Sequence, residues 1–160
     1  MKELKIESKF TVYDSLDDTS QEVQELMRKA INVRNNAYAP YSKFNVGAAL
    51  LLENGEVITG SNQENASYPS GLCAERTAIY YAGAQYPNVR ILEMAITATS
   101  KNAPTTKPIP PCGACRQAIS EYEVKQDYPI IIYFMGESGK VIKSDSLANL
   151  LPLVFDKSVL

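Results

Sequence analysis

Apolar residues along the chain follow two spacings, one typical of helices and one typical of strands. Where they recur every three or four positions, one face of a helix becomes apolar, whereas short unbroken apolar runs are typical of buried strands. The pattern predicts helices over residues 20–38, 73–84, 112–123 and 144–151, and strands over 46–52, 56–60, 91–97, 129–134 and 139–142. Thr19, followed by Glu22, is the expected N-cap of the first helix. Asn54-Gly55 predicts a hairpin turn.

The order of these elements predicts the fold class. Strands that alternate with helices after an initial hairpin indicate an α/β protein with a mixed sheet of about five strands and helices on both faces. Residues 1–18 precede this pattern, and their apolar residues alternate with polar ones as in a half-buried strand. We interpret residues 1–18 as an N-terminal extension, either an extra strand or an interface arm. Residues 19–160 are interpreted as one domain.

Composition narrows the classes of partner. A chain of 160 residues can bury one proper core. A formal net charge of −2 does not suit binding along a nucleic-acid backbone. The sequence contains no apolar run near the ~20 residues of a membrane span, and its N-terminus lacks the apolar core of a signal peptide. We therefore expect a cytoplasmic protein with neither nucleic acid nor membrane as a partner.

The cysteines form the main chemical signal. All three lie in two short stretches, Cys73-Ala74-Glu75-Arg76 and Pro111-Cys112-Gly113-Ala114-Cys115, and the chain has no histidine. Structural zinc sites use four protein ligands, whereas catalytic sites use three and leave the fourth position to water. Both stretches are expected at helix starts, where the helix dipole favours thiolate. We therefore predict a catalytic zinc ion held by Cys73, Cys112 and Cys115.

Two charged residues complete this hypothesis. Glu75 lies two residues from the first thiol, close enough to move protons beside the metal without binding it. Arg76 lies about one turn after Cys73 on the same helix face, so we expect it to donate to a ligand sulfur. Its positive charge would balance the three thiolates.

Other interpretations of the thiols stay open at this point. A lone C-x-x-C is also the thioredoxin-type redox motif, and a free cysteine is often only a small buried apolar residue. A non-enzymatic zinc-stabilised or thiol-redox module is therefore the competing hypothesis. It requires a fourth ligand or a disulfide, and the sequence offers no fourth cysteine and no histidine.

Five stretches together resemble the small, homotetrameric cytidine deaminases. They are Tyr41–Leu50, Gly60–Pro69, Cys73–Ala78, Pro111–Gln117 and Leu150–Pro152 with Phe155. The cysteine stretches match the three-cysteine form of the zinc-deaminase signature. The resemblance covers roughly residues 20–155 and implies a three-layer α/β/α sandwich with one Zn²⁺ per chain. It also implies hydrolytic deamination of cytidine and deoxycytidine to uridine and deoxyuridine, with release of ammonia, in pyrimidine salvage.

The resemblance also implies roles for individual residues. Cys73, Cys112 and Cys115 are the zinc ligands, Glu75 is the proton shuttle, and Arg76 donates to the ligand sulfurs.

At the substrate, the resemblance implies that Asn62 and Glu64 bind the ribose and that Phe44 packs on the pyrimidine. The Ala74 backbone N–H donates to the 2-carbonyl. A carboxylate such as Glu64 suits a ribose hydroxyl and repels phosphate, which favours a free nucleoside as substrate. A different nucleoside, such as an antibiotic one, stays open as an alternative.

Subunit contacts form the last expectation. The stretch Leu150–Phe155 is strongly apolar and must be buried somewhere, in the chain's own core or elsewhere. The resemblance implies a homotetramer in which Phe155 reaches a neighbour's pocket and Tyr68 lies near a neighbour's site. The small residues along 74–83 are expected to permit close packing between subunits.

Overall fold

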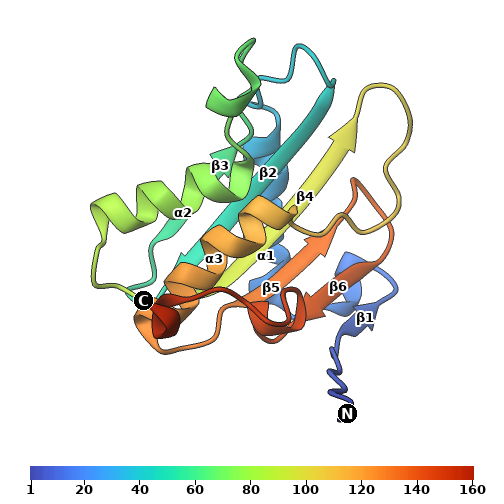
Figure 1. The fold of residues 1–160 in the computed structure, drawn as a ribbon. Coiled ribbons are helices and arrows are strands. Elements are labelled where there is room, and N and C mark those ends of the chain that lie inside the picture. Colours follow the sequence, from blue (N-terminus) through green and yellow to red (C-terminus); the bar gives the residue numbers. More distant parts are fainter.

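The computed structural model describes the backbone of residues 1–160 and every side chain except that of Val159. A sheet forms the middle layer, and helices cover both of its faces (Figure 1). The strands are β1 (Thr11–Tyr13), β2 (Phe44–Leu52), β3 (Val57–Ser61), β4 (Ile91–Ser100), β5 (Ile131–Met135) and β6 (Val141–Ser144). The α-helices are α1 (Gln21–Arg34), α2 (Ala74–Gln85) and α3 (Gly113–Gln126). The 3₁₀ turns are η1 (Leu16–Asp18), η2 (Tyr68–Ser70), η3 (Leu147–Asn149) and η4 (Lys157–Val159).

The sheet has the strand order β1-β6-β5-β4-β2-β3. Only β4 and β5 run parallel, joined by the crossover helix α3, and the other neighbours are antiparallel. The predicted hairpin joins β2 to β3, with Gly55 in the left-handed region at φ 86°. The mixed α/β class is thus confirmed, with six strands in place of about five because β1 adds an edge beside β6.

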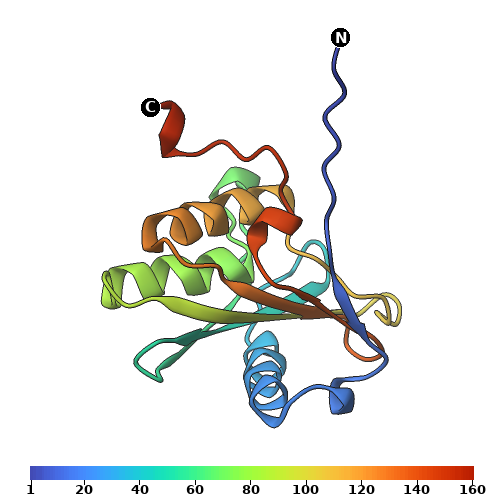
Figure 2. The same ribbon diagram turned by 90° about the horizontal axis from the view of Figure 1, so that it is seen from below.

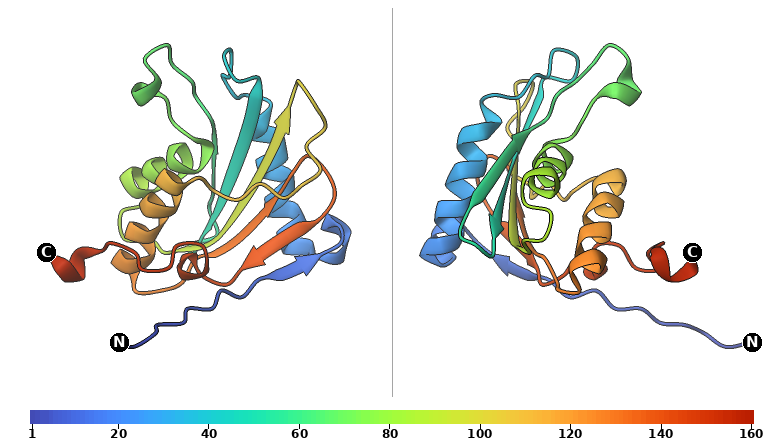
Figure 3. Two further views of the ribbon diagram at one scale, coloured as in Figure 1. Left: turned by 45° about the vertical axis from the view of Figure 1, so that its right-hand side comes forward. Right: turned by 90° about the vertical axis from the view of Figure 1, so that its left-hand side faces the viewer.

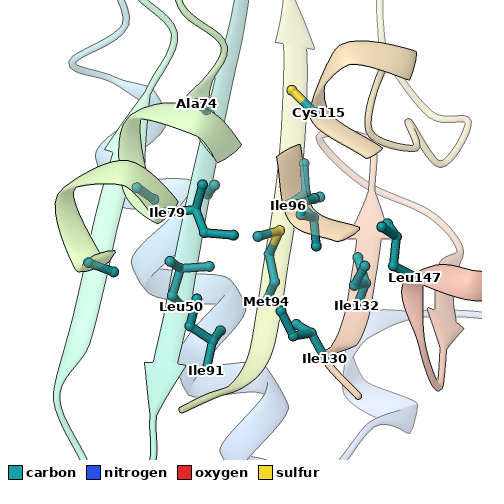
Figure 4. Packing of buried hydrophobic residues seen from close by; sticks show 14 of the residues in the cluster. Leu50, Ala74, Ile79, Ile91, Met94, Ile96, Cys115, Ile130, Ile132 and Leu147 are labelled. Atoms are coloured by element: carbon teal, nitrogen blue, oxygen red, sulfur yellow. The ribbon is translucent and has the colours of Figure 1, made fainter. Parts of the chain in front are cut away.

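The two faces of the sheet bury different side chains. Helix α1 covers one face, and α2 and α3 cover the other (Figures 2 and 3). Successive strand residues point to opposite faces, so Ala49 packs toward α1 while Leu50 packs beneath α2 and α3. The larger cluster lies beneath α2 and α3 and includes Leu50, Ile79, Met94, Ile96, Ile130 and Ile132 (Figure 4). Burial on both faces explains why the central strands are continuous apolar runs.

Three local predictions are corrected by the structure. The N-cap of α1 is Ser20, whose Oγ accepts from the Val23 N–H at 3.4 Å, because the Thr19 hydroxyl instead donates to the Leu16 carbonyl at 2.7 Å. Helix α1 ends at Arg34 and not at 38, because the backbone of Tyr38 pairs with that of residues 62 and 64.

The predicted helix over 144–151 is a single 3₁₀ turn, η3. The carboxylate of Glu123 accepts from the Leu147 N–H at 2.9 Å and the Ser146 hydroxyl at 2.6 Å, which holds the chain in one short turn.

The small residues of α2 pack within the chain. Ala74 and Ala78 are fully buried, and a Cβ added to Gly60 in β3 would lie 2.6 Å from the Ala74 carbonyl and the Ala78 N–H. A Cβ on Gly83 would lie 2.4 Å from the Tyr122 Oη of α3. The expectation that these residues serve packing between subunits is therefore wrong: they let α2 approach β3 and α3.

Both ends of the chain extend beyond the layers. Residues 1–10 leave the sheet from β1 toward the side of α2 and α3, and the C-terminal segment also lies on that side (Figure 2). Among the described residues, no helix is both long enough and apolar enough to cross a bilayer.

Candidate metal centre and active site

The starts of α2 and α3 bring the three thiols together. Cys73 is the N-cap of α2, Cys112 is the N-cap of α3, and Cys115 lies in the first turn of α3. Their sulfur atoms all lie within 4.8 Å of one another, and the Cys73 and Cys112 sulfurs are 3.9 Å apart. A tetrahedral site with Zn–S distances near 2.3 Å separates its sulfurs by about 3.8 Å. The donor set and its spacing therefore fit Zn²⁺.

The local structure leaves these sulfurs free for a metal. Neither capping cysteine uses its side chain to cap its own helix, although the Cys73 and Cys112 carbonyls accept from the N–H groups of Thr77 and Arg116. The Arg116 Nε also donates to the Pro111 carbonyl at 2.8 Å, so the residue before Cys112 is held from inside α3.

Arg76 supplies the positive charge at this centre. Its Nη2 donates to the Cys73 sulfur at 3.4 Å. The pKa of Cys73 falls to about 5, first because of its hydrogen bond with Cys115, with Arg76 adding to the effect and burial opposing it. The pKa of Cys115 is raised by the same hydrogen bond and by burial. The environment thus favours at least one thiolate before any metal binds.

Glu75 lies beside the thiols and is buried, with 4% of its surface exposed. Burial is the main cause that raises the pKa of its carboxyl, and the negative charge of Cys73 raises it further. A carboxyl whose pKa is moved toward neutrality is suited to taking and returning protons.

A cavity of about 520 Å³ opens in front of Cys73 and Arg76. This volume is in the range of ~300–1,000 Å³ typical of small-molecule sites. Its walls are formed by Tyr41, Ser42, Asn62, Gln63, Glu64, Asn65, Tyr68, Gly71 and Leu72, with Cys73 and Arg76. A second hollow of about 400 Å³ lies between the far ends of α2 and α3, and none of the predicted site residues lines it.

Asn62 and Glu64 are both at this cavity, and both hold nearby backbone. The Asn62 amide accepts from the Val46 N–H at 2.7 Å and donates to the Phe44 carbonyl at 2.9 Å. The Glu64 Oε2 accepts from the Tyr41 N–H at 2.9 Å. The Ser42 hydroxyl is the first cause that lowers the pKa of Glu64. Glu64 therefore presents a charged carboxylate to the cavity.

The family model for the cytidine and deoxycytidylate deaminase zinc-binding region matches residues 20–130. The chain belongs to this deaminase family. Cytidine deaminase from Halalkalibacterium halodurans is 51% identical over 132 residues, which cover 82% of this chain and 92% of that protein. Cytidine deaminase from Sporosarcina psychrophila is 40% identical over 136 residues, which cover 85% and 93% of the two chains.

Solved structures agree with this membership. The crystal structure of cytidine deaminase from Burkholderia pseudomallei superposes with a TM-score of 0.72 at 36% identity, and the match covers 86% of this chain and 100% of that one. The segment that matches the zinc-binding region of the deaminase family includes all three thiols, which makes Cys73, Cys112 and Cys115 the candidate zinc ligands of this chain. The resemblance and the three-layer fold are confirmed.

The remaining predicted residues of this deaminase are only partly brought together. Tyr68 lies at the cavity, 75% exposed, with its ring 5.9 Å from that of Tyr41. Phe44 is half-buried and Ala74 is buried, and neither of them lines the cavity. Phe155 is 61% exposed and lies over α3, where its carbonyl accepts from the Gln117 amide at 2.8 Å.

The apolar C-terminal stretch is divided between two environments. Leu150 belongs to the chain's own core, whereas Leu153 and Phe155 are exposed. Sequence reasoning gave no role to Tyr41 and Ser42, although both line the cavity. Both residues belong to the stretch Tyr41–Leu50, which carried the family resemblance. That resemblance did not indicate that they line a binding site.

Proposed function

We propose that this protein catalyses the zinc-dependent hydrolytic deamination of cytidine and deoxycytidine to uridine and deoxyuridine, with release of ammonia, as a step of pyrimidine salvage. One observation carries the proposal: three thiols converge at two helix starts beside the buried carboxyl of Glu75. The family and its named relatives support the same reaction.

When bound at the three thiols, zinc supplies a Lewis acid that activates water near neutral pH. Glu75 accepts a proton from the attacking water at its carboxylate and delivers it to the pyrimidine N3. It then takes the proton of the new hydroxyl on C4 and delivers it to the departing amine, so that C4 becomes a carbonyl and ammonia leaves. The Ala74 N–H is at the first position of α2 and has no partner within its own helix. We assign to it the hydrogen bond to the 2-carbonyl of the substrate.

Glu64 and Asn62 are proposed to bind the sugar. Glu64 keeps its charge because its pKa is lowered, so it accepts from ribose hydroxyls and repels a phosphate. Asn62 is held in place by the start of β2. We assign to Phe44, in the same part of β2, the packing against the pyrimidine ring of the bound substrate. This arrangement favours a free nucleoside over a nucleotide.

The protein is further proposed to act as a homotetramer whose active sites are shared between subunits. Tyr68 and Phe155 support this, because both are large, apolar and mostly exposed in the single chain. Phe155 lies away from the cavity of its own chain and is therefore free to enter a neighbour's. The free thiols suit a reducing cytoplasm.

Turnover and metal content test the reaction. Zinc should be found at about one ion per chain, and cytidine absorbance should fall on incubation with the protein. Cys112→Ala should lose metal and activity together. A metal-free but active protein would contradict the proposal, and a panel of nucleosides separates cytidine from any other substrate.

Glu75→Gln tests the proton shuttle. It should keep zinc and fold while turnover falls by about 10²–10⁴-fold, as is typical for acid–base residues. Glu93→Gln is the matched control, because Glu93 is a partly buried carboxyl of β4 whose pKa is also raised by burial. Retention of half the wild-type turnover by Glu75→Gln would disprove the role.

Subunit mixing tests the shared site. Phe155→Ala should weaken substrate binding and leave zinc bound. When Glu75→Gln and Phe155→Ala chains are dissociated and reassociated together, some sites should combine an intact Glu75 with a neighbour's intact Phe155. Those sites should recover wild-type-like affinity. A fully active monomer in sedimentation at assay concentration would exclude sharing.

A non-enzymatic zinc or redox module is the competing function. It requires a fourth metal ligand or a disulfide, and within the described side chains neither another cysteine nor a carboxylate joins the three thiols. A metal held by these three thiols would keep its fourth coordination position open, which favours a catalytic zinc site over a structural one.

A further inference from the structure

Residues 1–10 carry an amphipathic pattern that the fold of the single chain leaves unused. Leu4, Ile6 and Phe10 are 77%, 47% and 39% exposed, and Val12 of β1 is 54% exposed. The segment continues from β1 as an extended arm that leaves the body of the fold (Figures 2 and 3). The family model begins at residue 20, so this arm lies outside the segment that the family shares.

The backbone of the arm has one occupied edge and one open edge. The Lys9 N–H donates to the Asn149 Oδ1 at 3.2 Å, on the side of β6 and the turn that follows it. Successive N–H groups of an extended strand point to opposite edges, so the backbone groups of Ser8 and Phe10 face outward. The described residues show no other hydrogen bond from residues 1–10 to the rest of the chain. Such an unpaired edge is a template for another strand.

We propose that this edge pairs with the same edge of a second copy of this chain, as antiparallel strands with Ser8 opposite Ser8. In this register the apolar residues meet one another: Ile6 faces Phe10, and Leu4 faces Val12. The facing residues are all even-numbered, which are the positions whose backbone groups point outward. Apolar matching and hydrogen-bond direction therefore select the same alignment.

The charges of the arm are compatible with this alignment and exclude the odd-numbered centres. On the opposite face of the arm, Glu7 of each copy lies across from Lys9 of the other, and opposite charges across strands stabilise the pair. Centring the pair on Glu7 or on Lys9 would place like charges across from each other. Centring it on Ile6 would also place Glu7 across from Lys5, so charge alone does not exclude that register, but Phe10 would then lie across from Lys2 and lose its apolar partner. Within a single arm, Glu7 forms an ion pair with Lys5. That pair is mostly exposed, so giving it up for the contact with Lys9 of the other copy costs little.

The pairing has a two-fold axis, as expected for contacts between identical chains. Residues 3–5 of each copy lie beside β1 of the other, so two six-stranded sheets become one continuous sheet. The arm is remote in sequence from the cavity residues and the thiols. The interface therefore stands independently of the proposed function.

A cysteine at the two-fold axis tests the pairing in the full-length protein. Hydrogen-bonded antiparallel pairs have Cα atoms ~5.5 Å apart, within the range that a disulfide spans. Ser8→Cys should give a covalent dimer with oxidised glutathione, above the background of the wild type with its own three cysteines. Lys2→Cys is the matched control, because two copies of position 2 would lie roughly 40 Å apart.

A charge exchange tests the register. In chains that carry Ser8→Cys, adding Lys9→Glu replaces two attractive pairs by two repulsive ones and should lower crosslinking by about tenfold or more. Adding Glu7→Lys as well restores both pairs and should restore crosslinking. In the register centred on Ile6, position 7 faces Lys5 and position 9 faces Glu3. The same double exchange would there place like charges across from each other, so crosslinking would not recover.

Zinc content and cytidine turnover are measured on the same samples and should not change. Loss of turnover would concern the proposed function alone. The pairing is overturned if Ser8→Cys crosslinks no better than Lys2→Cys, or if the double exchange crosslinks as poorly as Lys9→Glu.

Discussion

The Arg76 guanidinium donates from Nη2 to the Cys73 sulfur at 3.4 Å, across a single turn at the start of α2. A cation in this place offsets the charge of three thiolates and withdraws electron density from one of them. The contact joins the proposed zinc ligand Cys73 to Arg76, and both residues line the cavity. It therefore links the electronic state of the metal to the site where substrate would bind.

Arg76→Gln should keep zinc but move the acid limb of the pH–rate profile to higher pH, by about one unit or more. The uncompensated thiolates donate more strongly to the metal and so oppose ionisation at the site. Arg76→Lys keeps the positive charge, so the acid limb of its pH–rate profile should lie between those of the wild type and Arg76→Gln. Superimposable pH–rate profiles for wild type and Arg76→Gln would show that the contact has no electronic role.

Arg116 connects the residue before Cys112 to the segment that follows η3. Its guanidinium donates to the Pro111 carbonyl and the Leu150 carbonyl, each at 2.8 Å. Arg116→Met should weaken zinc affinity by about 10–100-fold, as is typical when supporting contacts of metal ligands are lost. Transfer of zinc to a chromophoric chelator measures this. Arg28→Met, which removes an exposed arginine of α1, is the control, and equal transfer from both variants would contradict the expectation.

Gly60 sets the distance between β3 and α2. In Gly60→Ala, the new Cβ would meet the Ala74 carbonyl and the Ala78 N–H at 2.6 Å, so the free energy of unfolding should fall by about 1–3 kcal/mol. Gly113→Ala is the control, because none of the described atoms lies within 4 Å of its added Cβ. It should be neutral or stabilising by up to about 1 kcal/mol. Denaturant unfolding compares the two, and equal midpoints would disprove the close approach.

Glu137 holds the loop that leads to Cys112. It accepts from the Thr99 hydroxyl and from the Thr105 N–H, and the Thr99 contact is the first cause that lowers its pKa below 4.5. A carboxyl with a lowered folded-state pKa stabilises the fold above its unfolded value and loses that contribution as the pH falls through the folded value. The melting temperature of Glu137→Gln should therefore be lower than that of the wild type at pH 7.

The difference between the two melting temperatures should narrow as the pH falls below about 4.5, where the unfolded carboxyl begins to bind its proton. Glu121→Gln, which changes an exposed carboxylate of α3, should follow the wild type throughout. A gap that stayed constant with pH would show that the charge of Glu137 does not contribute.

The sequence by itself determined the features that depend on neighbouring residues. Periodicity located the three α-helices and the central strands, because a helix or strand places its apolar side chains at fixed intervals. The three candidate zinc ligands could also be named from the sequence, since cysteines at two expected helix starts are a local signal, and the structure places them at those starts. Element ends were less certain. The N-cap of α1 depended on whether the Thr19 hydroxyl was already engaged by Leu16, which only the folded chain decides.

Only the tertiary structure decided which surfaces meet. The small residues of α2 suggested a subunit contact, yet Gly60 of β3 lies directly against two of them. The spacing of residues along one helix carries no information about which element packs against it. The apolar C-terminal stretch was likewise divided, with Leu150 in the core and Phe155 outside it. Convergence of three sulfurs within 4.8 Å required α2 and α3 to begin side by side over one sheet. That placement follows from the packing of distant strands, which no local pattern specifies.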